Sequence, residues 1–271
     1  MKIIRVFPRR TKATPTDNMA FVGDPSMFAE ADEVHISVSF SWDLPEAERL
    51  EKEWRHVAPV KIGGPATGQR GENFIPGLYL KKGYVITSRG CPNRCWFCSV
   101  HEREGNVREL PIAEGWNVLD DNLLACSDNH IKAVFAMLSK QKERPLFTGG
   151  LEAARLKPWH VEELSKLKPN RMFFAYDSPS SREPLYEAGK MLASAGFKIC
   201  HPLRAYVLIG YHGDTFEKAE SRLVDCFKAG FTPMAMLYRD KTGKRDPAWV
   251  KFTHPWARPA SIYAKMNEII S

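Results

Sequence analysis

Apolar residues in the first part of the chain form short runs separated by an amphipathic stretch. Runs of β-branched and aromatic side chains at residues 3–7, 34–40 and 60–62 predict three strands. Residues 45–56 carry apolar side chains at helical spacing, with charges on the opposite face, and so predict a helix. This pattern indicates a small α/β unit over residues 1–82.

Strand and helix signals alternate from residue 83 onward. Apolar runs predict strands at residues 84–88, 116–119, 145–148, 171–176, 204–210 and 233–238. Helical spacing predicts helices at residues 128–141, 158–167, 181–195 and 215–228. Because each crossover between parallel strands needs a helix, the alternation predicts a parallel sheet.

Polar and glycine residues mark where some of these elements end. Asp128 is the predicted N-cap of the helix that it begins. Gly149 and Gly150 are predicted to end the third strand, and Gly196 is predicted to cap the C-terminus of the helix before it.

Length and composition limit the possible classes of protein. With 271 residues, of which 44% are hydrophobic, the chain can bury one substantial core. It has no run of about 18 apolar residues and no signal-peptide pattern, so we expect a cytoplasmic protein with no membrane partner. Cys126, Cys200 and Cys226 are scattered singly, which favours buried thiols; a second iron-sulfur cluster is the alternative.

The net charge of +7 is unevenly placed along the chain. Residues 239–258 hold six Lys or Arg side chains against two Asp, with Trp249, Phe252 and Trp256 among them. Such a segment can hold phosphates and stack on bases, so the extension over residues 241–271 favours a nucleic acid or nucleotide substrate. The alternative is a solvated basic tail whose aromatic side chains pack on the preceding domain.

Three cysteines carry the clearest chemical signal. Cys91, Cys95 and Cys98 form a Cys-x3-Cys-x2-Cys motif in the loop after the strand predicted at residues 84–88. Three thiolates can bind a 4Fe-4S cluster and leave one iron without a protein ligand, open to a small molecule. His101 lies three positions further on, so a Cys3His structural zinc site is the alternative.

This spacing, with Phe97 directly before the last cysteine, resembles the signature of the radical S-adenosylmethionine (SAM) superfamily. The resemblance implies that the open iron binds SAM and that reductive cleavage gives a 5'-deoxyadenosyl radical, which abstracts a hydrogen atom from a substrate. It implies an α/β fold with an open (β/α)6 partial TIM barrel over residues 83–240 and the small N-terminal unit before it. It also implies a one-electron reductant similar to flavodoxin or ferredoxin as a partner.

The resemblance further implies a SAM site at the carboxyl ends of the strands. The expected cofactor-binding residues are Phe97, Asp120, Asp121, Asn122, Asp177, Ser178, Gly210 and Tyr238. The family binds the SAM amino group with a Gly-Gly-Glu-like stretch after the second strand. Residues 120–122 hold that position after the second strand. Residues 149–152 are more similar to the Gly-Gly-Glu-like stretch, but they follow the third strand. A helix-start cluster is the structural alternative for residues 120–122.

The other expected residues also take their roles from the resemblance. Asp177 and Ser178 lie where the family binds the ribose hydroxyls. Gly210 begins a turn that lets the backbone approach the adenine, and the Phe97 backbone would face the adenine as well. Tyr238 would close the far wall of the site.

The N-terminal unit is similar to part of the cobalamin-binding domain of one branch of the superfamily. The ligating Asp-x-His-x-x-Gly motif of that branch is absent around His35, so we expect a cobalamin-free unit. Residues 63–77, rich in Gly and Pro, are predicted to form a mobile link.

Two functions from different classes fit these patterns. The first is a radical SAM enzyme that acts on a substrate which the sequence does not specify. The second is a non-catalytic zinc or iron-sulfur module that binds nucleic acid through its basic segment.

Overall fold

The computed structural model describes residues 1–198 and 202–270, so the Cys200 prediction lies outside the described residues. The chain divides into two compact units. The first contains residues 1–115 and 241–243, and the second contains residues 116–240 and 244–271. The predicted domain limits at residues 82 and 240 differ from these unit limits and stay predictions. Each unit is described by itself below.

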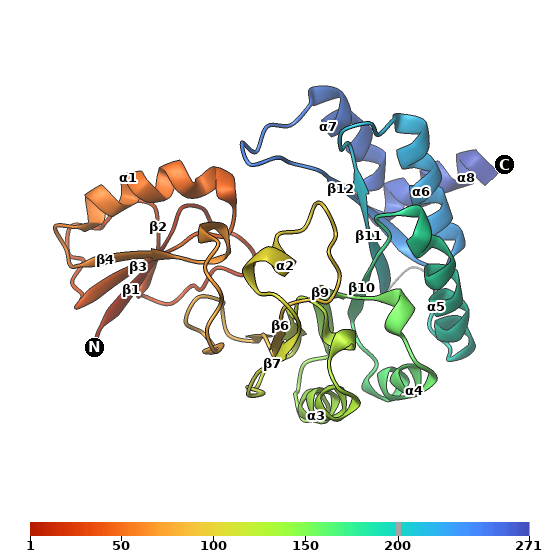
Figure 1. Cartoon of the computed structure of the whole chain (residues 1–271), viewed down its shortest axis with the longest axis horizontal. Coiled ribbons are helices and arrows are strands. Elements are labelled where there is room, and N and C mark those ends of the chain that lie inside the picture. Colours follow the sequence, from red (N-terminus) through yellow and green to blue (C-terminus); the bar gives the residue numbers. More distant parts are fainter. Residues whose placement is uncertain (199–201, 271) are drawn as a thin grey trace. The chain divides into compact units, whose positions relative to one another are not determined.

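The first unit contains a parallel sheet with the strand order β2-β1-β3-β4. Its strands are β1 (Ile3–Phe7), β2 (Ala20–Val22), β3 (Glu33–Ser37) and β4 (Val60–Gly63), and helix α1 (Leu44–Trp54) lies along one face (Figure 1). Val34 and Ile36 of β3 pack with Leu50 and Trp54 of α1 in a buried core. The predicted strands and helix are confirmed. Strand β2 was not predicted, because a run of three residues shows no periodicity.

A short segment from late in the chain belongs to this first unit. Gly243 lies against the indole of Trp42, since a Cβ at residue 243 would be 2.6 Å from Trp42 Cγ. Its φ of +70° also favours glycine. Lys241 O accepts a hydrogen bond from Ser41 Oγ at 3.4 Å, so residues 241–243 are held beside the start of α1.

The cysteine loop also lies in the first unit, between two short strands. The strand predicted at residues 84–88 is divided into β5 (Tyr84–Val85) and β6 (Ser88–Arg89). Helix α2 (Val100–Arg103) and strand β7 (Arg108–Glu109) follow the loop. β6 and β7 pair antiparallel, so the two ends of the loop are adjacent.

The second unit is a parallel sheet with helices between its strands. Its strands have the order β12-β11-β10-β9-β8 and are β8 (Asn117–Val118), β9 (Leu146–Leu151), β10 (Arg171–Ala175), β11 (Leu203–Ile209) and β12 (Thr232–Leu237). Its helices are α3 (Asp128–Ser139), α4 (Pro158–Leu167), α5 (Arg182–Ser194), α6 (Phe216–Lys228), α7 (Pro247–Thr253) and α8 (Pro259–Ile270). Neighbouring strands pair in parallel throughout. The parallel α/β fold is confirmed, and the partial-barrel form stays a prediction.

Strand β9 continues past its predicted end. It runs through Gly149 and Gly150 to Leu151. The reason is close packing on the residues that follow β8, because a Cβ at Gly149 would lie 2.3 Å from Asp120 O. The prediction that the two glycines end this strand is therefore wrong.

Two helix caps were predicted, of which one is correct. Ser127, rather than Asp128, caps α3, and its Oγ accepts a hydrogen bond from His130 N at 3.2 Å. Asp128 instead pairs with Lys157 at 2.7 Å. Gly196 follows α5 with a φ of +84°, as predicted for a C-terminal cap.

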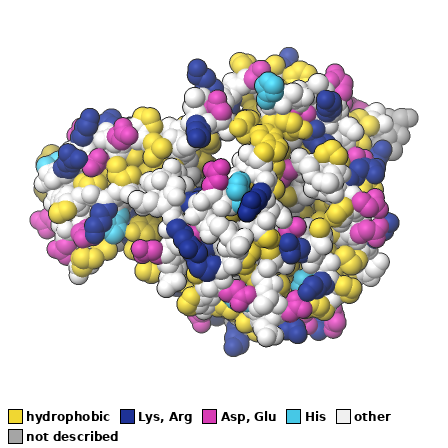
Figure 2. All heavy atoms as spheres, in the orientation of Figure 1, with side chains coloured by type: hydrophobic (Ala, Val, Ile, Leu, Met, Phe, Trp, Pro, Cys, Tyr) yellow, Lys and Arg dark blue, Asp and Glu magenta, His cyan; other side chains and the backbone are white. Residues whose placement is uncertain are grey.

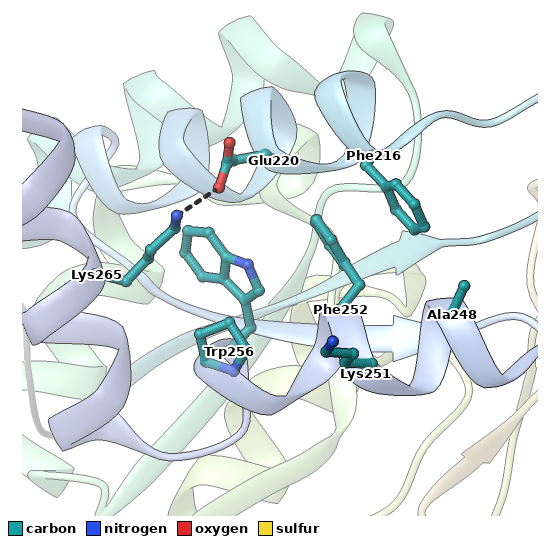
Figure 3. A pocket seen from close by; sticks show the side chains of 8 residues that line it. Phe216, Glu220, Ala248, Lys251, Phe252, Trp256 and Lys265 are labelled. Carbon is teal, nitrogen blue, oxygen red and sulfur yellow. Dashed lines mark ion pairs between the residues drawn. The ribbon is translucent and has the colours of Figure 1, made fainter.

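The aromatic side chains of the C-terminal extension pack within the second unit. The ring of Phe216 on α6 lies 4.5 Å from that of Trp249 and 5.2 Å from that of Phe252, between centroids. Trp256 is only 1% exposed. Figure 3 shows Phe216, Phe252 and Trp256 around a pocket of about 320 Å³. These contacts agree with the packing alternative for the extension and leave Trp256 unable to stack on a base.

The surface shows no separation of charge on the face in view. Figure 2 shows Lys and Arg side chains interspersed with Asp and Glu. Within residues 1–198 and 202–270, no helix has the length and apolar character needed to span a membrane.

Candidate functional site

The three motif cysteines lie on a loop of the first unit whose two ends are bonded to each other. Cys91 N donates a hydrogen bond to Gly105 O at 3.1 Å, which joins the start of the loop to its end. Cys98 N donates to Cys95 O at 3.0 Å, so the last two cysteines flank a tight turn. Cys91, Cys95 and Cys98 are partly exposed thiols outside any disulfide.

Gly90 makes this closure possible. Its φ is +87°, and a Cβ there would lie 2.3 Å from Asn106 O. A side chain at this position would therefore push the two ends of the loop apart.

The donor set fits an iron-sulfur cluster in kind and number. One loop supplies three partly exposed thiols, the ligand type that such clusters use. Across the part of the chain that the structure describes, no three or more His, Cys, Asp or Glu side chains are gathered as a metal site. The fit therefore depends on thiol chemistry and on the closed loop, and the three cysteines stay predicted ligands.

His101, the fourth ligand of the zinc alternative, is on α2. Its Nε2 lies 4.0 Å from Glu102 Oε1, and its Nδ1 is buried without a hydrogen-bond partner. Phe97 packs edge-on against the more exposed ring of Trp96, with 5.4 Å between centroids.

In the second unit, the two alternative SAM amino-group stretches are bonded to each other. Asn122 Nδ2 donates a hydrogen bond to Glu152 Oε2 at 2.6 Å, and Arg155 Nε donates to the same oxygen at 2.7 Å. Asp120 and Asn122 are buried, and Asn122 makes no side-chain cap bond to the helical turn that follows. The residues after β8 and β9 thus form one polar cluster. Asn122 also directly precedes the 3-10 helix Leu123–Ala125, which agrees with the helix-start alternative.

Asp177 and Ser178 follow β10. Asp177 Oδ1 accepts a hydrogen bond from Leu208 N at 2.9 Å. Burial raises the pKa of Asp177 to about 6, although that bond and the charge of Arg222 favour the ionised form. The hydroxyl of Ser178 lies 2.9 Å from that of Ser180. Asp177 therefore also fixes the backbone of β11.

The turn after β11 contains an ion pair that sequence reasoning missed. Gly210, with a φ of +70°, donates its N–H to Asp214 Oδ2 at 2.8 Å. Arg222 on α6 donates to the same carboxylate oxygen at 2.7 Å and to Leu208 O at 3.0 Å. The Asp214 side chain is fully buried, so the turn is held by a buried charge pair. The sequence gives little indication of this ion pair, since Asp214 and Arg222 are eight positions apart and lie on different elements.

A cluster of hydrogen-bonded polar side chains within the sheet was also not predicted. Thr148 Oγ1 donates to Asn117 Oδ1 at 2.6 Å, and Tyr206 OH donates to Thr148 O at 3.3 Å. The ring of Tyr206 stacks on Phe173 with 4.7 Å between centroids. Burial raises the pKa of Tyr206 to about 12, so it stays protonated at neutral pH. Single polar residues inside otherwise apolar strands were the only pattern in the sequence that could have indicated this cluster.

The predicted residues fall into two groups by compact unit. Phe97 and the three cysteines belong to the first. Residues 120–122 and 177–178, together with Gly210 and Tyr238, belong to the second. Tyr238 follows β12, and its N–H donates to Ile209 O at 2.8 Å. Within the second unit, the predicted residues therefore follow the strand ends, as the topology required.

Comparisons with known proteins show a likeness in fold. No protein-family model matches the sequence. The search of curated proteins finds no match either. The fold is similar to that of TsrM from Kitasatospora setae, a radical S-adenosylmethionine methyltransferase solved with cobalamin and a [4Fe-4S] cluster bound. The TM-score is 0.58 at 12% sequence identity, over 87% of this chain and 74% of TsrM. The likeness shows that this chain shares the fold of a radical SAM enzyme.

Proposed function

We propose that this protein is a radical SAM enzyme. The observation that carries the proposal is the Cys-x3-Cys-x2-Cys motif on a closed loop, in a chain whose fold is similar to that of TsrM. Cys91, Cys95 and Cys98 would hold a 4Fe-4S cluster with one open iron. When bound, the cluster would supply the electron that cleaves SAM to methionine and a 5'-deoxyadenosyl radical, and the radical would abstract a hydrogen atom from the substrate.

Residues of the second unit would bind and orient SAM. The Asn122–Glu152 pair offers a carboxylate that suits the ammonium of the methionine moiety. Asp177 and Ser178 would take the ribose hydroxyls, and the backbone of Gly210 would approach the adenine, as would that of Phe97. Tyr238 would line the remaining wall, and Asp120 and Asp121 would complete the polar cluster beside Asn122.

The proposed enzyme does not use cobalamin. TsrM was solved with cobalamin, but this chain lacks the family's ligating histidine motif around His35. Both ring nitrogens of His35 are engaged, Nε2 with Glu33 Oε2 at 2.9 Å and Nδ1 with Tyr79 OH at 2.6 Å. Purified protein incubated with hydroxocobalamin should therefore retain none after gel filtration. Stoichiometric retention would contradict this part of the proposal.

The proposed partners are a flavodoxin-like or ferredoxin-like electron donor in the cytoplasm and a nucleic acid or nucleotide substrate. The basic side chains of residues 239–258 support the second partner, whereas the packing of Trp249 and Trp256 removes the argument from base stacking. A binding module without catalysis stays the alternative, because it needs only the cysteines, His101 and the basic segment.

One experiment separates the two functions. Protein reconstituted anaerobically with iron and sulfide is incubated with SAM and dithionite. The enzyme should release 5'-deoxyadenosine and methionine, and Cys95→Ala should release neither and bind less iron. Cys126→Ala is the matched control, because Cys126 is buried in the second unit and should keep both properties. A colourless wild-type protein with one tightly bound zinc would favour the binding module.

A further inference from the structure

One buried carboxylate lies at the point where the cysteine loop closes. The Glu104 side chain is 1% exposed, and its Oε1 accepts a hydrogen bond from Arg103 Nε at 3.0 Å. Arg108 Nη2 lies 3.6 Å from Glu104 Oε2. Gly71 N donates to both carboxylate oxygens, at 3.1 and 3.2 Å. We call Glu104 with Arg89, Arg103 and Arg108 the Glu104 cage.

Arg89 reaches the cage from the strand before the cysteines. A Cβ at Gly71 would lie 3.1 Å from Arg89 Nε and 3.1 Å from Glu104 Oε1, so the two groups pack around the same glycine. Arg89 and Arg108 are directly paired across β6 and β7. The cage therefore connects the strand that enters the cysteine loop with the helix and strand that leave it.

The cage also holds the segment that was predicted to be a mobile link. Arg108 Nη2 donates to Gly71 O at 2.6 Å, and Arg103 Nη1 donates to Pro65 O at 3.4 Å. With the bond from Gly71 N to Glu104, these contacts fix two points within residues 63–77. Loss of the carboxylate would release both this segment and the end of the loop.

The charges in the cage do not balance. Three guanidinium groups surround a single carboxylate, and Arg89 Nε and Arg108 Nη1 are buried without a hydrogen-bond partner. Burial acts to raise the pKa of Glu104, but the bonds from Arg103 and Gly71 and the charge of Arg89 outweigh it and hold the pKa below its usual value. The four side chains of the Glu104 cage thus carry a net positive charge at neutral pH.

We propose that Glu104 is a positioning residue that closes the cysteine loop, and that the surplus positive charge of its cage favours the reduced state of the cluster. The charge argument rests on the proposed function. Three thiolates make the site anionic, and reduction adds one more negative charge, which the partly buried guanidinium groups of the cage would stabilise. The backbone N–H of Cys91 donates a hydrogen bond to Gly105 O, and Gly105 directly follows Glu104. The cage is therefore one residue away from the bond that holds the first predicted ligand.

The test compares three variants by two measurements. Glu104→Gln removes the anion and Arg108→Gln removes a cation. Glu102→Gln is the matched control, because Glu102 is on α2, which ends directly before Glu104, and its side chain is 77% exposed. Redox titration should place the cluster potential of Glu104→Gln above the wild-type value and that of Arg108→Gln below it, while Glu102→Gln stays close to wild type. A purely structural role would not shift the potential in opposite directions.

The second measurement needs no cluster. Hydrogen exchange of the Gly71 and Cys91 amides in the metal-free protein should be about tenfold faster in Glu104→Gln and Arg108→Gln than in wild type. Unchanged exchange in Glu104→Gln, or potentials that shift in the same direction, would overturn the inference. If wild type binds no iron, the proposed function fails and with it the charge argument. The exchange measurement then still decides whether Glu104 positions the loop.

Discussion

Asn122 donates a hydrogen bond to Glu152, with 2.6 Å between Nδ2 and Oε2. The two residues follow neighbouring strands of the second unit, and by sequence alone they were competing candidates for one role. Because they share a bond, we expect Asn122→Ala and Glu152→Ala each to weaken SAM binding by about tenfold. The double variant should lose less than the product of the two single losses.

Calorimetric titration of the reconstituted protein with SAM measures these affinities. Glu163→Ala is the matched control, since its carboxylate is in an exposed pair with Lys166 on α4. Additive losses would show that Asn122 and Glu152 act separately. A loss confined to Asp121→Ala would restore the prediction from sequence.

Asp177 should make stability depend on pH. Its folded-state pKa is raised from 3.8 to about 6, so the folded protein binds this proton more tightly than the unfolded chain. The protonated Asp177 carboxyl therefore contributes its full stabilisation below the unfolded-state pKa, and this contribution is lost as the pH rises through about 6. The free energy of unfolding of wild type, minus that of Asp177→Asn, should fall by about 3 kcal/mol across this window. Urea unfolding at several pH values measures it, and the same difference for Ser178→Ala should stay flat.

The buried pair of Asp214 and Arg222 should be strongly coupled to stability. Asp214→Ala leaves the Arg222 guanidinium buried without its carboxylate, so we expect a loss of about 3–5 kcal/mol in the free energy of unfolding. Glu187→Ala is the control, since its pair with Lys190 is exposed and should contribute little to stability. Denaturant unfolding compares the two, and equal losses would contradict the importance of burial.

Gly149 should not tolerate a side chain. A Cβ there would lie 2.3 Å from Asp120 O, so Gly149→Ala must separate the end of β9 from the residues after β8 and should cost about 1–3 kcal/mol. At Gly63 a Cβ would meet nothing within 4 Å, so Gly63→Ala should lie within about 0.5 kcal/mol of wild type. Thermal unfolding of both variants checks this, and a neutral Gly149→Ala would show that the two strands can separate freely.

The alternation of strands and helices could be predicted because each element carries its own periodicity. Helix α1 and the strands from β9 to β12 lie close to their predicted positions, since their apolar faces are four or more residues long. Strands β2 and β7 were missed because two or three residues contain no repeat. Gly149 was wrongly predicted to end a strand, because the close contact that requires a glycine there is with Asp120, which is distant in sequence.

In the candidate site, too, the local features could be predicted from the sequence and the contacts between distant residues could not. Cys91, Cys95 and Cys98 are visible because their spacing is local. The bond between Asn122 and Glu152 joins residues 30 positions apart, and the Glu104 cage draws on residues from 71 to 108. Such contacts depend on the tertiary path of the chain, which no local pattern encodes.

The packing of Gly243 on Trp42 limits how this protein can be divided. Since residues 241–243 belong to the first unit while residues 116–240 and 244–271 form the second, neither unit can be excised as one contiguous fragment. A chain ended after Asp240 would lose both the cover over Trp42 and the helices α7 and α8. Domain exchange with a relative would therefore have to transfer three residues separately from the sequence on either side of them.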